Sequence, residues 1–168
     1  MEARTNTLGP LSIRRAEEKD IAGLQHLLEQ VNRVHHEGRP DLFKLTTKYS
    51  EDDLKVLLQQ EHFPVFVALD EEGTVLGHAF CQIIEHKGER LLEDIKTLYI
   101  DDICVDEHAR RKAIGKRLYA AVLAYAQEIG CYNVTLNVWE CNPGACAFYR
   151  SLGMQTQKYG METILGRV

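Results

Sequence analysis

Hydrophobic residues recur at two spacings along the chain, and the change between these spacings predicts where strands and helices lie. Alternation of apolar and polar residues over 11–15 predicts a first strand. A period near 3.6 residues over 21–31 then predicts an amphipathic helix of roughly four turns. Pro40 disfavours helical backbone at the residue before it, so this helix is expected to end by Arg39.

The elements expected after Pro40 follow the same two periods. The segment 38–50 has no clear period and is expected to form a loop. The later elements are, in chain order, a short helix over 51–60, a hairpin of strands 63–69 and 74–84, a strand over 96–105, a helix over 113–129, a strand over 134–138, a helix from Asn142 to Gly153 and one or two closing strands within 154–165. This order predicts a mixed α/β (α+β) sheet.

The composition is that of an ordinary globular domain. The 168 residues are 45% hydrophobic and 27% charged, and the formal net charge is −5. No apolar run is long enough to span a membrane, and residues 1–7 lack the basic and apolar regions of a signal peptide. Five cysteines without a Cys-x-x-Cys pair favour a reducing compartment. We expect a cytoplasmic protein that binds neither membranes nor metal ions.

Basic residues gather at the start of the helix expected over 113–129. Five of the 20 basic residues lie within 110–117: Arg110, Arg111, Lys112, Lys116 and Arg117. A loop of small residues that opens a helix presents unpaired backbone N–H groups at the positive end of the helix dipole, which binds phosphate. A nucleic-acid patch is the alternative, but the acidic net charge argues against it.

Two segments together resemble one family. Arg110-x-x-Ala113-x-Gly115 and, about thirty residues later, Asn142-x-x-Ala145-x-x-Phe148-Tyr149 are similar to two motifs of the GCN5-related N-acetyltransferase (GNAT) superfamily. The resemblance implies a single N-acetyltransferase domain over 1–168, with a central sheet of about six to seven strands flanked by about four helices. It also implies acetyl-CoA as the co-substrate.

The resemblance further implies which residues hold acetyl-CoA. In the superfamily the first motif receives the pyrophosphate, the preceding strand pairs with the pantetheine amides, and the second motif lies along the pantetheine arm. The matching residues here are Ile103, Cys104 and Val105 on the strand, Arg110, Arg111, Lys112, Ala113, Ile114, Gly115 and Lys116 in the loop, and Asn142, Ala145, Phe148 and Tyr149 in the second motif. Ala113 stands where the superfamily usually has glycine, and a left-handed backbone is costly for alanine.

Acetylation of an amine requires that the amine lose a proton, since a lysine-like amine has a pKa of about 10.4. Asp101 and Asp102, within the strand expected over 96–105, are the candidate carboxylates. Side chains alternate along a strand, so only one of the two is expected to face the acetyl group. A resemblance to polyamine acetyltransferases favours Asp102 as the base and Asp101 as the acceptor contact. An ion pair at a strand end is the alternative reading of both.

Tyr149 is the remaining catalytic candidate. In members of the superfamily with this motif the phenol protonates the departing thiolate, whereas a half-buried core aromatic is the structural alternative. The resemblance therefore implies an N-acetyltransferase that uses direct attack in a ternary complex, with a small cationic amine as the expected acceptor. Asp41, Phe43 and Tyr49 are candidates for the acceptor pocket. A peptide or protein acetyltransferase and a non-catalytic acyl-CoA-binding module are the alternatives, and the segment 161–165 could pair across a homodimer.

Overall fold

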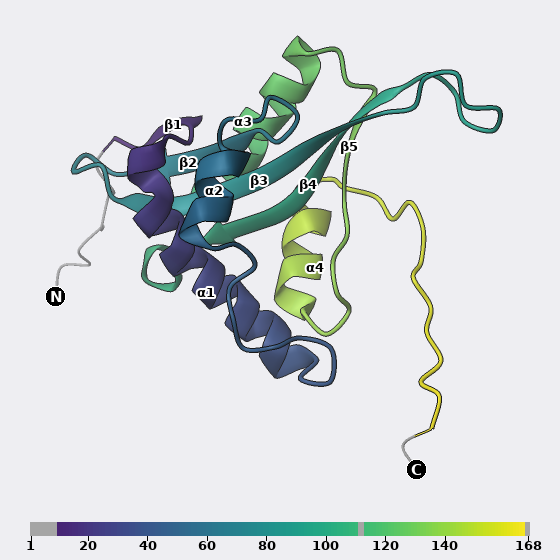
Figure 1. Cartoon of the computed structure of the whole chain (residues 1–168), viewed down its shortest axis with the longest axis horizontal. Coiled ribbons are helices and arrows are strands. Elements are labelled where there is room, and N and C mark those ends of the chain that lie inside the picture. The colour runs from purple at the N-terminus through teal and green to yellow at the C-terminus, as the bar shows by residue number, and fades with distance from the viewer. Residues whose placement is uncertain (1–9, 111–112, 167–168) are drawn as a thin grey trace, which may run out of the picture. The chain divides into compact units, whose positions relative to one another are not determined.

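The computed structural model describes residues 10–110 and 113–166 (Figure 1). The chain divides into two compact units, Met1–Asn137 and Val138–Val168. The first unit contains the sheet, three helices and two short 3₁₀ turns. The second contains one helix and the chain that follows it.

Among its described residues, the first unit has a single sheet of five strands in the order β1-β2-β3-β4-β5. Neighbouring strands from β1 to β4 are antiparallel, whereas β4 and β5 are parallel. The strands are β1 (Ser12–Arg15), β2 (Val65–Leu69), β3 (Val75–Glu85), β4 (Lys96–Val105) and β5 (Asn133–Leu136). The mixed α/β fold is thus confirmed.

Two helices, α1 (Ile21–Gly38) and α2 (Glu51–Leu57), pack on one face of the sheet. Leu24 and Leu28 of α1 and Leu54 of α2 are almost completely buried against Val67 of β2 and Phe80 of β3. The apolar stripe that predicted α1 is therefore the stripe that enters the core. Ser50 caps α2 by accepting a hydrogen bond of 3.1 Å from the backbone N–H of Asp53.

The opposite face of the sheet is covered by α3 (Ile114–Glu128). Ile114 and Leu118 are buried there. The helix approaches β3 at Gly77, where an added Cβ would lie 2.9 Å from Leu118 Cδ1 and 3.0 Å from the Cys104 carbonyl oxygen. Gly77 is therefore needed for close packing of helix on strand.

The second unit contains α4 (Pro143–Ser151), which Asn142 caps by accepting a 3.1 Å hydrogen bond from the backbone N–H of Ala145. No strand lies within 154–166, so the closing strands expected there are wrong, and the described sheet has five strands rather than six to seven. Tyr159, Met161 and Leu165 are almost fully exposed, because this segment finds no strand to pair with in the described chain. Within the described ranges, no helix combines the length and apolar character needed to cross a membrane.

Candidate active site

The parallel pair of strands opens where β4 continues beyond β5. Pairing between them runs from Thr97 with Asn133 to Ile100 with Leu136 and ends there. β4 extends for five further residues, 101–105, and stays paired with β3 on its other side. In the part of the chain that the structure describes, no strand pairs with this second edge of 101–105. Backbone N–H and C=O groups along such an edge can bind an extended ligand as an added strand.

A β-bulge lies at the point where β5 ends. Phe80 pairs with Asp102 and Cys81 with Ile100, which leaves Asp101 as the extra residue on β4. Asp102 therefore lies on the face of Phe80, the face that carries α1 and α2. Asp101 reaches the same face, because its carboxylate bonds to the loop that joins these two helices. The expectation that only one carboxylate could face the site is therefore wrong, since the bulge interrupts the alternation on which it rested.

The carboxylate of Asp102 is held by a buried histidine. Nε2 of His78, on β3, lies 2.6 Å from Oδ2 of Asp102, and the His78 side chain is 0% exposed. Nδ1 of His78 is buried without a hydrogen-bond partner among the described residues. A carboxylate only accepts hydrogen bonds, so Nε2 of His78 carries the proton of this bond and donates it to Asp102. The His78 ring also meets Phe80 edge to face, at 4.9 Å between centroids.

The carboxylate of Asp101 is paired with a lysine from the α1–α2 loop. Nζ of Lys48 donates a hydrogen bond to Oδ2 of Asp101 and lies 5.4 Å from the centre of the Tyr49 ring. Partial burial alone would lower the pKa of Lys48, but the hydrogen bond and charge of Asp101 outweigh it, and the pKa is raised. Burial also raises the pKa of Tyr49. The Tyr49 ring in turn stacks on Phe80, with centroids 5.7 Å apart.

The turn after β4 is fixed by a buried glutamine of α1. Gln30 is 6% exposed; its Nε2 donates to Asp106 at 3.1 Å, and its Oε1 accepts from the backbone N–H of Glu107 at 3.1 Å. Asp106 also accepts from the backbone N–H of His108, at 2.8 Å. Burial acts to raise the pKa of Asp106, but these hydrogen bonds outweigh it and the pKa is lowered. These hydrogen bonds therefore fix the conformation of the turn 106–108 that follows β4.

At the start of α3 the backbone takes an unusual form. Ala113 has φ 57° and ψ 15°, which lies in the left-handed region. Among the described residues, Ala113 alone combines a positive φ with a side chain other than that of glycine. Ile114 is buried, whereas Arg110 and Lys116 are exposed. Arg111 and Lys112 lie outside the described residues. Arg117 does not join the basic group, because its guanidinium donates to the carbonyl of Leu11 at 2.8 Å.

Residues of the second motif all lie in the second unit, on or beside α4. Asn142 is its N-cap, and Ala145 supplies the N–H that the cap accepts. Phe148 and Tyr149 are half-buried, with ring centroids 5.3 Å apart. The prediction that Asn142 caps a helix with Pro143 at its first turn is confirmed. Asp41, Phe43 and Tyr49 all lie in the segment between α1 and α2, and of these Tyr49 meets the carboxylate pair through Lys48.

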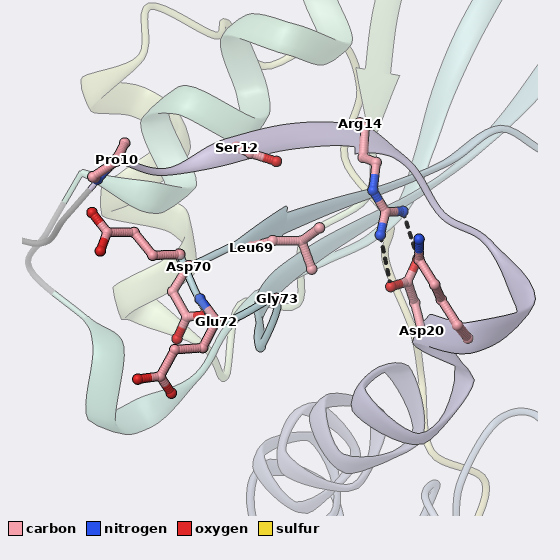
Figure 2. A pocket seen from close by; sticks show the side chains of 10 residues that line it. Pro10, Ser12, Arg14, Asp20, Leu69, Asp70, Glu72 and Gly73 are labelled. Carbon is pink, nitrogen blue, oxygen red and sulfur yellow. Dashed lines mark hydrogen bonds and ion pairs between the residues drawn. The ribbon is translucent and has the colours of Figure 1, made fainter.

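An open depression elsewhere in the first unit contains none of the predicted site residues. It is lined by the start of β1 and the turn from Asp70 to Gly73 (Figure 2). Arg14 points along it to Asp20 and donates hydrogen bonds of 2.7 and 3.0 Å to the two carboxylate oxygens. This cation is already neutralised by a buried carboxylate, so the depression is a poor anion site.

Comparison with known proteins identifies the family. The family model described as "Acetyltransferase (GNAT) family" matches residues 28–154, which include the bulged strand, the start of α3 and α4. The chain belongs to the GNAT acetyltransferase family. The resemblance seen in the two motifs is thus confirmed.

This GNAT protein is similar to two solved structures and to a curated relative. A crystal structure of a mutant of the BH1408 protein from Bacillus halodurans is 30% identical, with a TM-score of 0.88 over 92% of this chain and 99% of that chain. An aminoglycoside acetyltransferase from an uncultured soil metagenomic sample, solved in complex with sisomicin, is 26% identical, with a TM-score of 0.68 over 93% of this chain and 97% of that one. Glucosamine 6-phosphate N-acetyltransferase 1 of Oryza sativa subsp. japonica is 30% identical over 53% of this chain and 51% of its own length. This chain therefore spans about half the length of that curated relative.

Proposed function

We propose that the protein is an acetyl-CoA-dependent N-acetyltransferase that acetylates a primary amine of a small cationic acceptor. One observation carries this proposal: the bulge in β4 puts Asp101 and Asp102 on the same face of the sheet, directly after the point where pairing between β4 and β5 ends. Two carboxylates beside an open strand edge suit a reaction in which a cation must be bound and then lose a proton.

The residues fit acetyl-CoA. The open edge of β4 offers the backbone of Ile103, Cys104 and Val105 to the pantetheine amides. The 15-residue α3 begins directly after Ala113, and its first N–H groups suit a pyrophosphate. Exposed Arg110 and Lys116 would add positive charge there. The family resemblance alone assigns Arg111 and Lys112 to the pyrophosphate, and Asn142, Ala145 and Phe148 to the pantetheine arm. The bound coenzyme supplies the acetyl thioester.

The proposed proton path uses two side chains. Asp102, with one oxygen held by His78, accepts the proton of the acceptor ammonium through its other oxygen, directly or through water. Asp101 binds the acceptor cation and orients it. Tyr149 donates its phenolic proton to the departing thiolate; this role rests on the family motif. Cys104 is not proposed as an acetyl carrier, because burial raises its pKa to about 12.

The acceptor is proposed from charge and from the relatives. The carboxylate pair favours a cation, and the named relatives include an acetyltransferase of aminoglycosides and one of glucosamine 6-phosphate. An amino group carried by a sugar therefore belongs among the small amines proposed here, beside polyamines.

The test is release of free thiol from acetyl-CoA across a panel of amines: glucosamine, glucosamine 6-phosphate, an aminoglycoside, spermidine and short peptides. We expect turnover with one class of small amine. Asp102→Asn is expected to lower kcat by about a hundredfold or more, as loss of a general base does. Tyr149→Phe should lower kcat at unchanged KM for acetyl-CoA.

Other outcomes of the same assay would replace the proposal. Turnover with peptides alone would identify a peptide or protein acetyltransferase. No turnover, with acetyl-CoA still raising the melting temperature, would favour a non-catalytic acyl-CoA-binding module. No thermal shift with acetyl-CoA would contradict coenzyme binding itself.

We further propose that residues 1–168 act as one N-acetyltransferase domain in the cytoplasm. All five cysteines are free, as suits a reducing compartment. The exposed apolar residues Met161, Ile164 and Leu165 suit pairing with a second copy of the chain. Light scattering that gave the mass of a monomer at micromolar concentration would contradict the dimer.

A further inference from the structure

We propose that Lys48 occupies the ammonium subsite of the acceptor and that a cationic acceptor must displace it to bind. Lys48 would then set the affinity and selectivity for the acceptor. The inference rests on the proposed function, because it takes Asp101 as the acceptor contact.

The surroundings of the Lys48 ammonium are those of a binding subsite for a primary amine. Nζ donates a hydrogen bond to Asp101 and lies 5.4 Å from the centre of the Tyr49 ring. The charge of Asp102 also acts favourably on it. A carboxylate, a second negative charge and an aromatic ring within cation–π distance together recognise an alkylammonium group.

The subsite does not depend on Lys48 for its construction. Asp101 projects from the bulge of β4, whose position is fixed by pairing with β3. Tyr49 is held by stacking on Phe80, which is 2% exposed. These groups would therefore keep their places if the lysine moved away. The carboxylate and the ring would then face a new ammonium group in place of the old one.

Lys48 is only partly enclosed at this subsite. Its side chain is 50% exposed, and it lies in the α1–α2 segment, which has no helix or strand between Gly38 and Glu51. Ion pairs of such exposed lysines are weak, so a soluble amine can compete with them. The apparent dissociation constant is the intrinsic one divided by the fraction of molecules in which the subsite is open. If Lys48 fills the subsite in about nine molecules of ten, its removal tightens binding about tenfold.

The competition also predicts selectivity. An amine that binds as a cation replaces the charge that it displaces, so Asp101 keeps a cationic partner. A neutral ligand of the same shape would leave Asp101 without a partner, and an unpaired carboxylate is costly when partly buried. A neutral molecule therefore meets the cost of displacing Lys48 without restoring the charge pair, whereas a cation restores it.

The experiment measures binding of putrescine by calorimetry to the full chain and to three variants. Lys48→Met removes the ammonium and keeps much of the side-chain length, and it is expected to bind putrescine about five to ten times more tightly than the parent. Lys48→Arg keeps a cation beside Asp101 and should bind like the parent. Lys44→Met removes the same charge from the same loop, and its dissociation constant should stay within about twofold.

Two further measurements complete the design. 1,4-Butanediol, the neutral analogue of putrescine, should bind the parent more weakly than putrescine does, because it displaces Lys48 without giving Asp101 a new cation. Asp101→Asn should abolish the gain when it is combined with Lys48→Met. Circular dichroism and melting temperature check that each variant is folded.

Binding of putrescine by Lys48→Met that is equal to or weaker than binding by the parent would overturn the inference, and so would an equal gain in Lys44→Met. Absence of putrescine binding in every variant would also overturn it. Thiol release from acetyl-CoA is measured separately on the same samples. Turnover without a gain in binding would remove only the role of Lys48, whereas a gain in binding without turnover on any amine would remove the proposed enzyme activity.

Discussion

Nε2 of His78 lies 2.6 Å from Oδ2 of Asp102, although the two residues are 24 positions apart on neighbouring strands. The histidine is completely buried, whereas the Asp102 side chain is 13% exposed. One oxygen of Asp102 is therefore held from within the protein, which leaves the other for the face where the acceptor is proposed to bind. A base whose orientation is fixed in this way needs less rearrangement during proton transfer.

This pair predicts a coupled loss of activity. His78→Phe removes the N–H donor while keeping an aromatic ring, and kcat is expected to fall at least about tenfold with the KM for acetyl-CoA unchanged. The double variant with Asp102→Asn should be no slower than Asp102→Asn alone, because both changes remove the same interaction. If instead the double variant lost kcat by the product of the two single losses, His78 would act independently of Asp102.

Ala113 predicts a stabilising substitution. Its φ of 57° is costly for a residue with a Cβ, by about 1–2 kcal/mol, and glycine adopts it freely. Ala113→Gly is expected to raise the unfolding free energy by about 0.5–1 kcal/mol, after the extra entropy of an unfolded glycine is taken into account. Ala120→Gly, at an exposed position inside α3, should lower it by about 1 kcal/mol. Urea unfolding of both variants tests the difference in sign, and two losses would contradict the left-handed assignment.

Asp20 predicts a pH-dependent contribution to stability. The carboxylate is 4% exposed; burial acts to raise its pKa, but hydrogen bonds from Arg14 and from the backbone N–H of Glu17 outweigh burial and lower the pKa below 3.8. The contribution is therefore fully present above the unfolded pKa of about 4 and is lost as the pH falls through the lower folded pKa. Asp20→Asn should lower the unfolding free energy by about 1–3 kcal/mol at neutral pH.

Urea unfolding of Asp20→Asn and the parent should accordingly converge as the pH falls below about 4. Glu18→Gln, an exposed acid two residues earlier, is the matched control and should follow the parent at every pH. A difference between Asp20→Asn and the parent that stayed constant down to about pH 2 would contradict the lowered pKa.

The cysteines predict an order of chemical labelling. Burial raises the pKa of the Cys81 and Cys104 thiols to about 12, whereas Cys141 is exposed. Because the thiolate is the reactive form, Cys141 should react with iodoacetamide first, and Cys81 and Cys104 only when the protein unfolds. Peptide mapping after a short reaction gives the order. Early labelling of Cys104 would reopen the question of an acetyl carrier at that position.

Much of the fold follows from local pattern. The strand expected over 96–105 and the observed β4 have the same bounds, because its apolar residues are flanked by polar turns at both ends. α3 was expected over 113–129 and spans Ile114–Glu128. α2 ends at Leu57 rather than at residue 60, since its last expected turn is taken up by hydrogen-bonded turns after the helix. Such ends depend on single contacts that the pattern does not contain.

The candidate site depends on contacts that no local pattern contains. Whether Asp101 is a bulge residue depends on the register with β3, and this register is set by partners about twenty positions away. Lys48 lies in a segment without hydrophobic periodicity, so the sequence pattern gave no reason to expect its contact with Asp101. His78 did offer a signal, as a polar residue on the Phe80 face of a buried strand, where it required a partner. The apolar residues of 154–165 suggested strands, but pairing also requires an available edge.

The bulge at Asp101 also constrains how the protein can change in length. Before it, Leu98 and Ile100 pair with residues on the α3 face; after it, Asp102 and Cys104 pair with residues on the α1 face. Loss of Asp101 itself would remove the bulge and leave Ile100 opposite Cys81 and Asp102 opposite Phe80, so the two faces would be unchanged. Loss of a residue within 102–105 would instead shift the side chains beyond it by one position, which exchanges the two faces along that segment. A change in length is therefore tolerable for the sheet at residue 101 and costly within 102–105. Descendants of this gene are expected either to keep the length of 96–105 or to lose the residue at the bulge.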